Sequence, residues 1–143
     1  IVGVKDSSYN LYENLKIENF SVFPGSELKL LKGLELGCEG IITATCNVTA
    51  SISRKVYDDF YKNEKQTANE MLCNVRRVFD QFNLISGLHS FMSNENEIYK
   101  NVLPPISLLN KKDKKKLSED LNKLNFQIET LRSTWNEFSK IFK

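Results

Sequence analysis

The sequence predicts an α/β fold, because strand and helix signals alternate in the first third of the chain and helical signals alone follow. Short apolar segments separated by helical patterns are the βα repeat of a parallel sheet. From residue 51 onward, apolar residues recur at the three- and four-residue spacing of helices. We therefore expect two regions, parallel strands with their helices in 1–50 and helices in 51–143.

Composition excludes several classes of protein. The 143 residues are 41% hydrophobic and 27% charged, with a net charge of +2. These values are typical of a folded domain and unlike those of disordered, collagenous or disulfide-rich chains. A charge near zero gives no general attraction for nucleic acid, and no apolar run is long enough to cross a membrane. We expect neither nucleic acid nor a membrane among the partners.

The cysteine and histidine content argues against disulfides and metals. Cys38, Cys46 and Cys73 are odd in number and form no CxxC pair, so they read as small core residues of a reduced, cytoplasmic protein. His89 is the one histidine, and no carboxylate cluster has the spacing of metal ligands. We expect no metal and no cofactor.

Three strands are expected in the first region, at 1–5, 20–23 and 40–43, with helices over 10–17 and 26–36 between them. The first strand opens the chain with β-branched residues. Natural domains seldom begin inside a core strand, so we expect further residues upstream.

The expected ends of these segments carry typical stop signals. Pro24 and Gly25 close the second strand, Ser26 is a good N-cap and Gly37 is a natural helix stop.

The second region contains four expected helices, over 51–62, 67–84 and 88–102 and from residue 113 onward. Two prolines at 104–105 end the third helix. The last helix carries an apolar stripe that alternates by four and three residues: Leu117, Leu121, Leu124, Ile128, Leu131, Trp135, Phe138 and Phe142. This stripe either packs on the chain's own helices or forms a seam with a second copy.

Lys5 is the strongest candidate for a reactive group. It ends an apolar strand, so its amine either extends to solvent or lies at the carboxyl end of the sheet, where ligands bind in parallel α/β folds. A buried amine resists protonation, because a charge is costly in a poor solvent. An uncharged lysine is a nucleophile that forms a Schiff base with a ketone.

Four segments in order resemble one enzyme family. Residues 3–8 (GVKDSS), 23–27 (FPGSE) and 36–47 (LGCEGIITATCN) resemble strands six, seven and eight of the pyruvate-dependent class I aldolases, and 104–109 (PPISLL) resembles the turn before the final helix. That superfamily contains dihydrodipicolinate synthase, N-acetylneuraminate lyase and 2-keto-3-deoxygluconate aldolase. The resemblance implies the C-terminal portion of a (β/α)8 TIM barrel, with its last three βα units in 1–50.

Within that family, Asp6 and the sequence Gly25-Ser26-Glu27 most resemble the archaeal 2-keto-3-deoxygluconate aldolases. This resemblance implies cleavage of a 2-keto-3-deoxy sugar acid to pyruvate and an aldehyde such as glyceraldehyde. The alternative within the family is a condensation of pyruvate with an aldehyde. An alternative of another class is a non-catalytic helical assembly module.

The resemblance also implies roles for individual residues. Lys5 matches the Schiff-base lysine, and Ser7 matches a hydroxyl that meets the sugar chain; Ser7 is alternatively an N-cap. Gly25, Ser26 and Glu27 match the substrate loop after strand seven, with Glu27 accepting hydrogen bonds from sugar hydroxyls. Two further positions match the end of strand eight beside the substrate, and are alternatively core residues: Thr43 and Ala44.

The chain departs from the family pattern in what it lacks. A (β/α)8 barrel takes about 250 residues, and this chain offers three of eight strands. The proton-shuttling tyrosine on strand five and the carboxylate-binding hydroxyls on strand two have no counterpart, and none of the five tyrosines lies in a matching segment. The expected partners are a keto-acid substrate, the upstream half of the barrel and further copies in a homotetramer.

Overall fold

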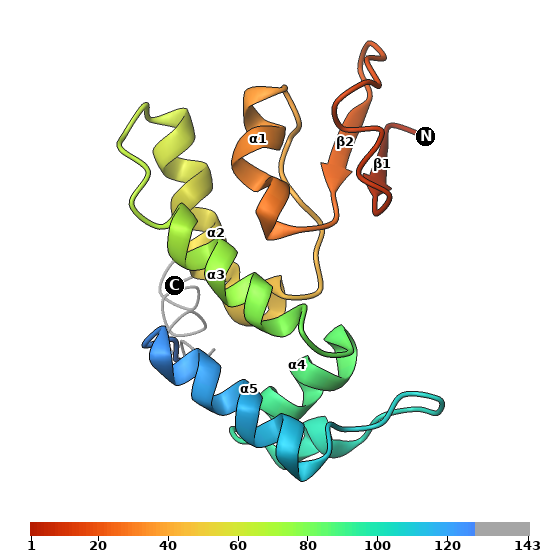
Figure 1. The fold of residues 1–143 in the computed structure, drawn as a ribbon. Helices are drawn as coiled ribbons and strands as arrows, with labels where there is room; N and C mark the ends of the chain where they lie inside the picture. The colour runs from red at the N-terminus through yellow and green to blue at the C-terminus, as the bar shows by residue number, and fades with distance from the viewer. Residues whose placement is uncertain (128–143) are drawn as a thin grey trace, which may run out of the picture.

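The computed structural model describes residues 1–127, which form a mixed α/β fold (Figure 1). Strands β1 (Gly3–Asp6) and β2 (Ser21–Pro24) lie side by side at the N-terminal end of the molecule. They pair in parallel with Lys5 opposite Phe23, so both strands end on the same side of the molecule.

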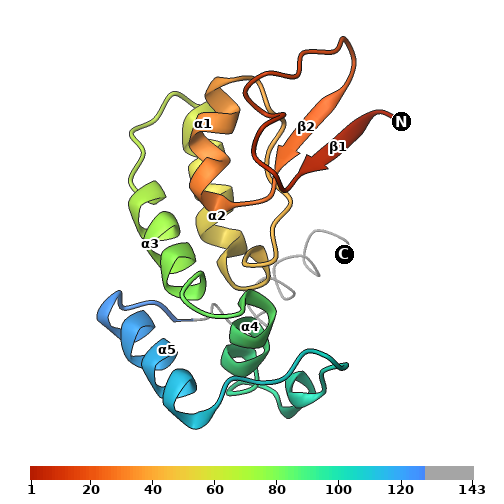
Figure 2. The same ribbon diagram turned by 45° about the vertical axis from the view of Figure 1, so that its right-hand side comes forward.

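Helices make up most of the remaining described chain. Helices α2 and α3 run side by side, with α1 packed between α2 and the strands, while α4 and α5 form a second group at the other end (Figures 1 and 2). Their bounds are η1 (Glu27–Lys29), α1 (Leu30–Glu35), α2 (Cys46–Tyr61), α3 (Asn69–Phe79), α4 (Leu84–Met92), η2 (Glu97–Lys100) and α5 (Lys111–Lys123).

Helix α1 follows the sequence signals closely. The Ser26 hydroxyl accepts a hydrogen bond from the Leu28 N–H at 3.3 Å and starts the short η1 turn that continues into α1. Leu30 and Leu34, four residues apart, are buried against α2, and Gly37 ends the segment with a φ of 87°.

Two apolar clusters support the helices. One joins Leu30 and Leu34 of α1 to Val56 of α2 and Leu72 of α3. The other joins the end of α3 to α4 and α5, with Leu117 and Leu121 each 1% exposed. For these two positions of the apolar stripe, packing on the chain's own helices is therefore correct.

The prediction of a helix over 10–17 is wrong. Residues 7–15 form a loop, with Tyr9 at a φ of 59°. The Asp6 carboxylate accepts hydrogen bonds from the N–H groups of Tyr9, Leu11 and Tyr12, at 2.9 to 3.0 Å. A side chain that takes these donors competes directly with helical hydrogen bonds.

The third strand expected at 40–43 is not formed as a strand in this chain. The Ile42 N–H donates to the Pro24 carbonyl at 3.1 Å, so the segment does run beside β2. It lies outside the described sheet, which consists of β1 and β2.

The long last helix is also shorter than expected. Helix α5 ends at Lys123, where the Phe126 N–H bonds the Leu121 carbonyl and Asn125 adopts a φ of 53°. The left-handed residue turns the chain, so α5 does not continue through Asn125. The remaining members of the stripe, from Ile128 to Phe142, lie outside the described residues.

The other helices begin or end at different residues from those expected. Helix α2 starts five residues earlier than expected, α3 is shorter than 67–84, and the helix expected over 88–102 is α4 followed by η2. None of the helices in the described part of the chain combines the length and apolar character needed to cross a membrane.

Candidate functional site

Three of the expected site residues meet where β1 and β2 end. A Cβ atom added to Gly25 would lie 3.4 Å from Lys5 Cε, 3.3 Å from Ser7 Oγ and 3.4 Å from the Asp6 carbonyl oxygen. The aliphatic side chain of Lys5 therefore lies against the backbone of Gly25, which has no side chain. The Gly25 N–H in turn donates to the Asp6 carbonyl at 2.9 Å, which holds the two strand ends together.

Asp6, next to Lys5, fixes the loop that follows. Its carboxylate is 1% exposed and also accepts the Ser8 N–H and hydroxyl, at 3.1 and 2.8 Å. Burial alone raises the pKa of Asp6, but the hydrogen bonds from Tyr12, Ser8, Leu11 and Tyr9 outweigh it and hold the pKa below its usual value. Asp6 is thus a carboxylate that organises the backbone around Lys5 and Ser7.

Glu27 lies in the interior instead of facing a substrate. Its carboxylate is fully buried and accepts hydrogen bonds from the Thr43 hydroxyl at 3.0 Å, the Thr49 hydroxyl at 3.1 Å and the Thr45 hydroxyl. Arg76 Nη1 of α3 forms an ion pair with it at 3.0 Å. Because four protein groups surround the carboxylate, the expected contact between Glu27 and sugar hydroxyls disagrees with the structure.

The other expected positions divide between the site and the interior. Ser26 is buried and serves as the N-cap of η1. Thr43 is half-buried and its hydroxyl lies between Glu27 and Arg76 Nη1, 2.9 Å from the latter. Ala44 packs against the apolar cluster that joins α3 to α4 and α5. The structure therefore brings Lys5, Ser7 and Gly25 together and assigns packing or hydrogen-bonding contacts to the remaining four.

Lys5 is exposed in this chain. The described residues alone therefore do not supply the dry surroundings that we expected for its amine. Tyr12 does not supply a proton-shuttling hydroxyl within the described residues, because it is buried and its hydroxyl donates to Glu13 at 2.6 Å. That hydrogen bond, together with burial, raises the pKa of Tyr12 to about 12.

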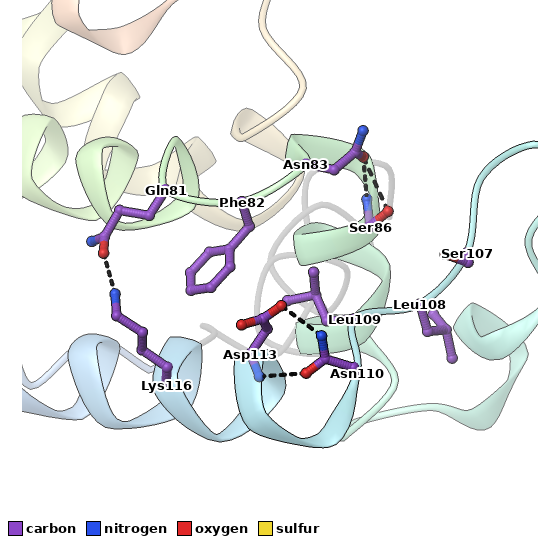
Figure 3. Close-up of a pocket in the computed structure, with 10 residues that line it drawn as sticks. All are labelled: Gln81, Phe82, Asn83, Ser86, Ser107, Leu108, Leu109, Asn110, Asp113 and Lys116. Carbon is purple, nitrogen blue, oxygen red and sulfur yellow. Dashed lines mark hydrogen bonds between the residues drawn. The ribbon is translucent and has the colours of Figure 1, made fainter.

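A pocket of about 530 Å³ lies elsewhere, between the end of α3, the start of α4 and the start of α5 (Figure 3). Two of its asparagine side chains bind backbone groups of the same pocket: Asn83 accepts from the Ser86 N–H at 3.1 Å, and Asn110 accepts from the Asp113 N–H at 2.9 Å. These bonds cap two helices. None of the predicted site residues lines this pocket, and within residues 1–127 no cluster of His, Cys, Asp or Glu could hold a metal ion.

The model of the dihydrodipicolinate synthetase family matches residues 1–124. The chain belongs to the dihydrodipicolinate synthetase family. The family expected from the sequence segments is therefore confirmed, while the nearness to 2-keto-3-deoxygluconate aldolases stays a prediction. No curated protein matches the chain.

Solved structures of this family share the fold. Dihydrodipicolinate synthase from Aquifex aeolicus matches 91% of this chain with 47% of its own, at 20% identity and a TM-score of 0.77. The enzyme from Thermotoga maritima matches 89% of this chain with 47% of its own, at 13% identity and a TM-score of 0.76. The 4-hydroxy-tetrahydrodipicolinate synthase from Methylacidiphilum fumariolicum matches 87% with 44%, at 16% identity and a TM-score of 0.76. The chain thus spans less than half the length of these synthases.

Sequence reasoning missed the residues that enclose Glu27. Arg76 is the clearest, because it follows Leu72 by four residues and Val75 by one and so falls on the buried face of α3. An arginine on an apolar face indicates a buried anionic partner, since an unpaired charge is costly there. Thr45 and Thr49, one turn apart at the start of α2, gave no comparable signal.

Proposed function

We propose that this chain carries the Schiff-base lysine of a pyruvate-forming carbon–carbon lyase, and that Lys5 is that lysine. The observation that carries the proposal is the position of Lys5 at the carboxyl end of β1 with its arm against Gly25, in a chain of the dihydrodipicolinate synthetase family. Parallel α/β folds bind their ligands at this end of the strands.

The proposed reaction begins when the Lys5 amine attacks the C2 carbonyl of a 2-keto acid and water leaves. The protonated imine withdraws electrons from the C3–C4 bond, which breaks as the C4 hydroxyl loses its proton and an aldehyde departs. The enamine that remains takes a proton at C3, and water hydrolyses the resulting imine to pyruvate and free Lys5. The base that moves these protons belongs to polypeptide outside this chain.

The proposed substrate is a 2-keto-3-deoxygluconate-type sugar acid, which is supported by the resemblance of Asp6 and residues 25–27 to the aldolases that cleave it. The enclosed carboxylate of Glu27 favours the second candidate, a condensation of pyruvate with an aldehyde, because this loop then offers no free acid to sugar hydroxyls. Both reactions use the same imine on Lys5.

The proposed working form contains more than this chain. The chain covers less than half of the matched synthases, so we propose that its barrel strands, the last three βα units in 1–50, are completed by further polypeptide. We call that assembly the complete enzyme and propose that it forms a homotetramer in the cytoplasm, where the three free cysteines remain reduced.

Trapping with borohydride tests the proposal. The complete enzyme, incubated with pyruvate and borohydride, should gain the mass of one reduced pyruvyl group on the peptide that contains Lys5. Lys5→Arg should abolish the label, while Lys16→Arg, at an exposed lysine of the following loop, should keep it. Labelling of no lysine, or of many lysines equally, would show a non-catalytic module instead.

Substrate assays then separate the two reactions. Release of pyruvate from 2-keto-3-deoxygluconate supports the lyase, whereas consumption of pyruvate only in the presence of an added aldehyde supports the condensation.

A further inference from the structure

A buried ionic cluster, formed by Glu27, Arg76, Thr43, Thr45 and Thr49, lies beneath the proposed site. The side chains of Glu27 and Arg76 are 0% and 8% exposed. Arg76 Nη1 reaches Glu27 Oε2 at 3.0 Å, Thr43 Oγ1 at 2.9 Å and Thr45 Oγ1 at 3.3 Å. The guanidinium and the carboxylate therefore share the same hydroxyl groups.

The cluster joins segments that are far apart in the sequence. Glu27 follows Gly25 by two residues, at the exit of β2, and Thr43 ends the extended segment beside β2. Thr49 belongs to the first turn of α2, and Arg76 lies 49 residues after Glu27, on α3. A single guanidinium thus connects a helix outside the proposed site to the loop that leaves β2 and to the segment that runs beside β2.

Asp80 holds the outer side of the guanidinium. Its carboxylate accepts a hydrogen bond from Arg76 Nε at 2.8 Å and is 40% exposed. Burial alone lowers the pKa of Arg76, but hydrogen bonds to Asp80 and Glu27 raise it above its ordinary value, so the charge is kept. Arg76 is consequently fixed from two directions.

Directional bonds are what this cluster adds beyond packing. A buried ion pair contributes little net stability compared with apolar side chains of similar volume, because both ions lose their hydration. An apolar pair, however, would not specify the orientation of the Glu27 carboxylate or of the three hydroxyls. Glu27 follows Gly25 by two residues, so the cluster anchors the segment that leaves β2, and Gly25 lies against the side chain of Lys5.

We propose that Arg76 is a positioning residue for the Lys5 reaction, acting through Glu27 to hold the Gly25 loop against the lysine. The inference rests on the proposed function and extends it to a helix that contributes no group to the site. Misplacement of a reacting group by about 1 Å costs up to roughly a hundredfold in rate, so a cluster anchored two residues from Gly25 is close enough to matter.

The test measures pyruvate trapping by the complete enzyme as a function of pyruvate concentration. Arg76→Met should raise the half-saturating pyruvate concentration at least tenfold, and Arg76→Lys, which keeps the charge but not both sets of bonds, should give an intermediate value. Arg77→Met is the matched control: Arg77 is exposed and bonds Asn74, so its loss should change nothing. A loss of folded protein alone lowers the amount of label but leaves the half-saturating concentration unchanged.

Asp80→Ala covers the case in which Arg76→Met fails to fold. Asp80 is partly exposed, so this variant should fold and raise the half-saturating concentration in the same direction by a smaller factor. Folded Arg76→Met, or folded Asp80→Ala if the former is lost, with the wild-type half-saturating concentration would overturn the inference. A wild-type enzyme that pyruvate never labels overturns the proposed function instead, so the two failures are distinguishable.

Discussion

Gly25 is the position at which one added methyl group should disturb the proposed site directly. Gly25→Ala would place a Cβ 3.3 Å from Ser7 Oγ and 3.4 Å from Lys5 Cε, so neighbouring atoms must move. We expect the rate of pyruvate trapping to fall roughly tenfold, because the lysine is displaced from its reactive position. Gly87→Ala is the control. Its added Cβ would lie 3.5 Å from the nearest atom, on Phe79, which is an ordinary contact, so trapping should be unchanged. Equal rates for Gly25→Ala and wild type would show that the lysine is not held by this contact.

Asp6 should make the free energy of unfolding depend on pH in the acid range. The pKa of Asp6 is lower in the folded protein than in the unfolded chain, so its carboxylate stabilises the fold above the unfolded pKa, and this contribution is lost as pH falls through the folded pKa. Asp6→Asn keeps the shape but offers fewer acceptors to the four N–H groups. We expect urea midpoints of the complete enzyme to favour wild type at pH 7, with a gap that narrows below about pH 5. A gap that is constant with pH would contradict this assignment.

For single residues, the sequence indicated which side chains are near the site but not always which way each side chain points. Lys5, Ser7 and Gly25 lie together as expected because β1 and β2 are parallel and end on the same side. Glu27 follows the same loop, yet its side chain turns inward to an arginine 49 residues away, and no local pattern encodes that partner. Long-range polar partners are set by tertiary packing, which a single sequence does not display.

The helices show which local signals suffice. The Ser26 cap and the apolar spacing located α1, and apolar spacing alone located α3, because both signals act within a few residues. Helix α4 begins four residues before the expected helix, at the Asn83 cap. The loop over 7–15 was misread because the Asp6 carboxylate binds backbone donors that a helix would otherwise use. The last helix was read too long because its stripe continues in the sequence past Asn125, where the backbone turns left-handed.

Asn110 should account for part of the stability of α5. Its side chain accepts the Asp113 N–H at 2.9 Å at the start of a helix that has six lysines among thirteen residues. Asn110→Ala should lower the free energy of unfolding of the complete enzyme by about 1 kcal/mol, measured by urea titration. Asn110→Asp should retain the bond, and Asn122→Ala, at an exposed position within α5, should cause no loss. A stable Asn110→Ala variant would mean that the apolar contacts of Leu117 and Leu121 alone hold α5.

The two parallel strands imply that the chain needs a partner. Within the described residues, β1 pairs on one side with β2 and has no strand on its other side. Unpaired strand edges bind other chains, so the 143-residue chain alone should aggregate and show no pyruvate trapping. Co-expression with the N-terminal half of a barrel of this family should restore a defined oligomer and labelling of Lys5, as measured by light scattering and mass spectrometry. A monomeric isolated chain with a cooperative melt would contradict this expectation.

The backbone of Gly25 covers one side of the Lys5 arm. An imine formed on this lysine, as proposed, would be screened from the Gly25 side, so its two faces would not be equivalent. Solvent deuterium taken up by the enamine of an isotopically labelled pyruvate should therefore enter with a single handedness. The stereochemistry of the pyruvate methyl group would in this way depend on the missing side chain of Gly25.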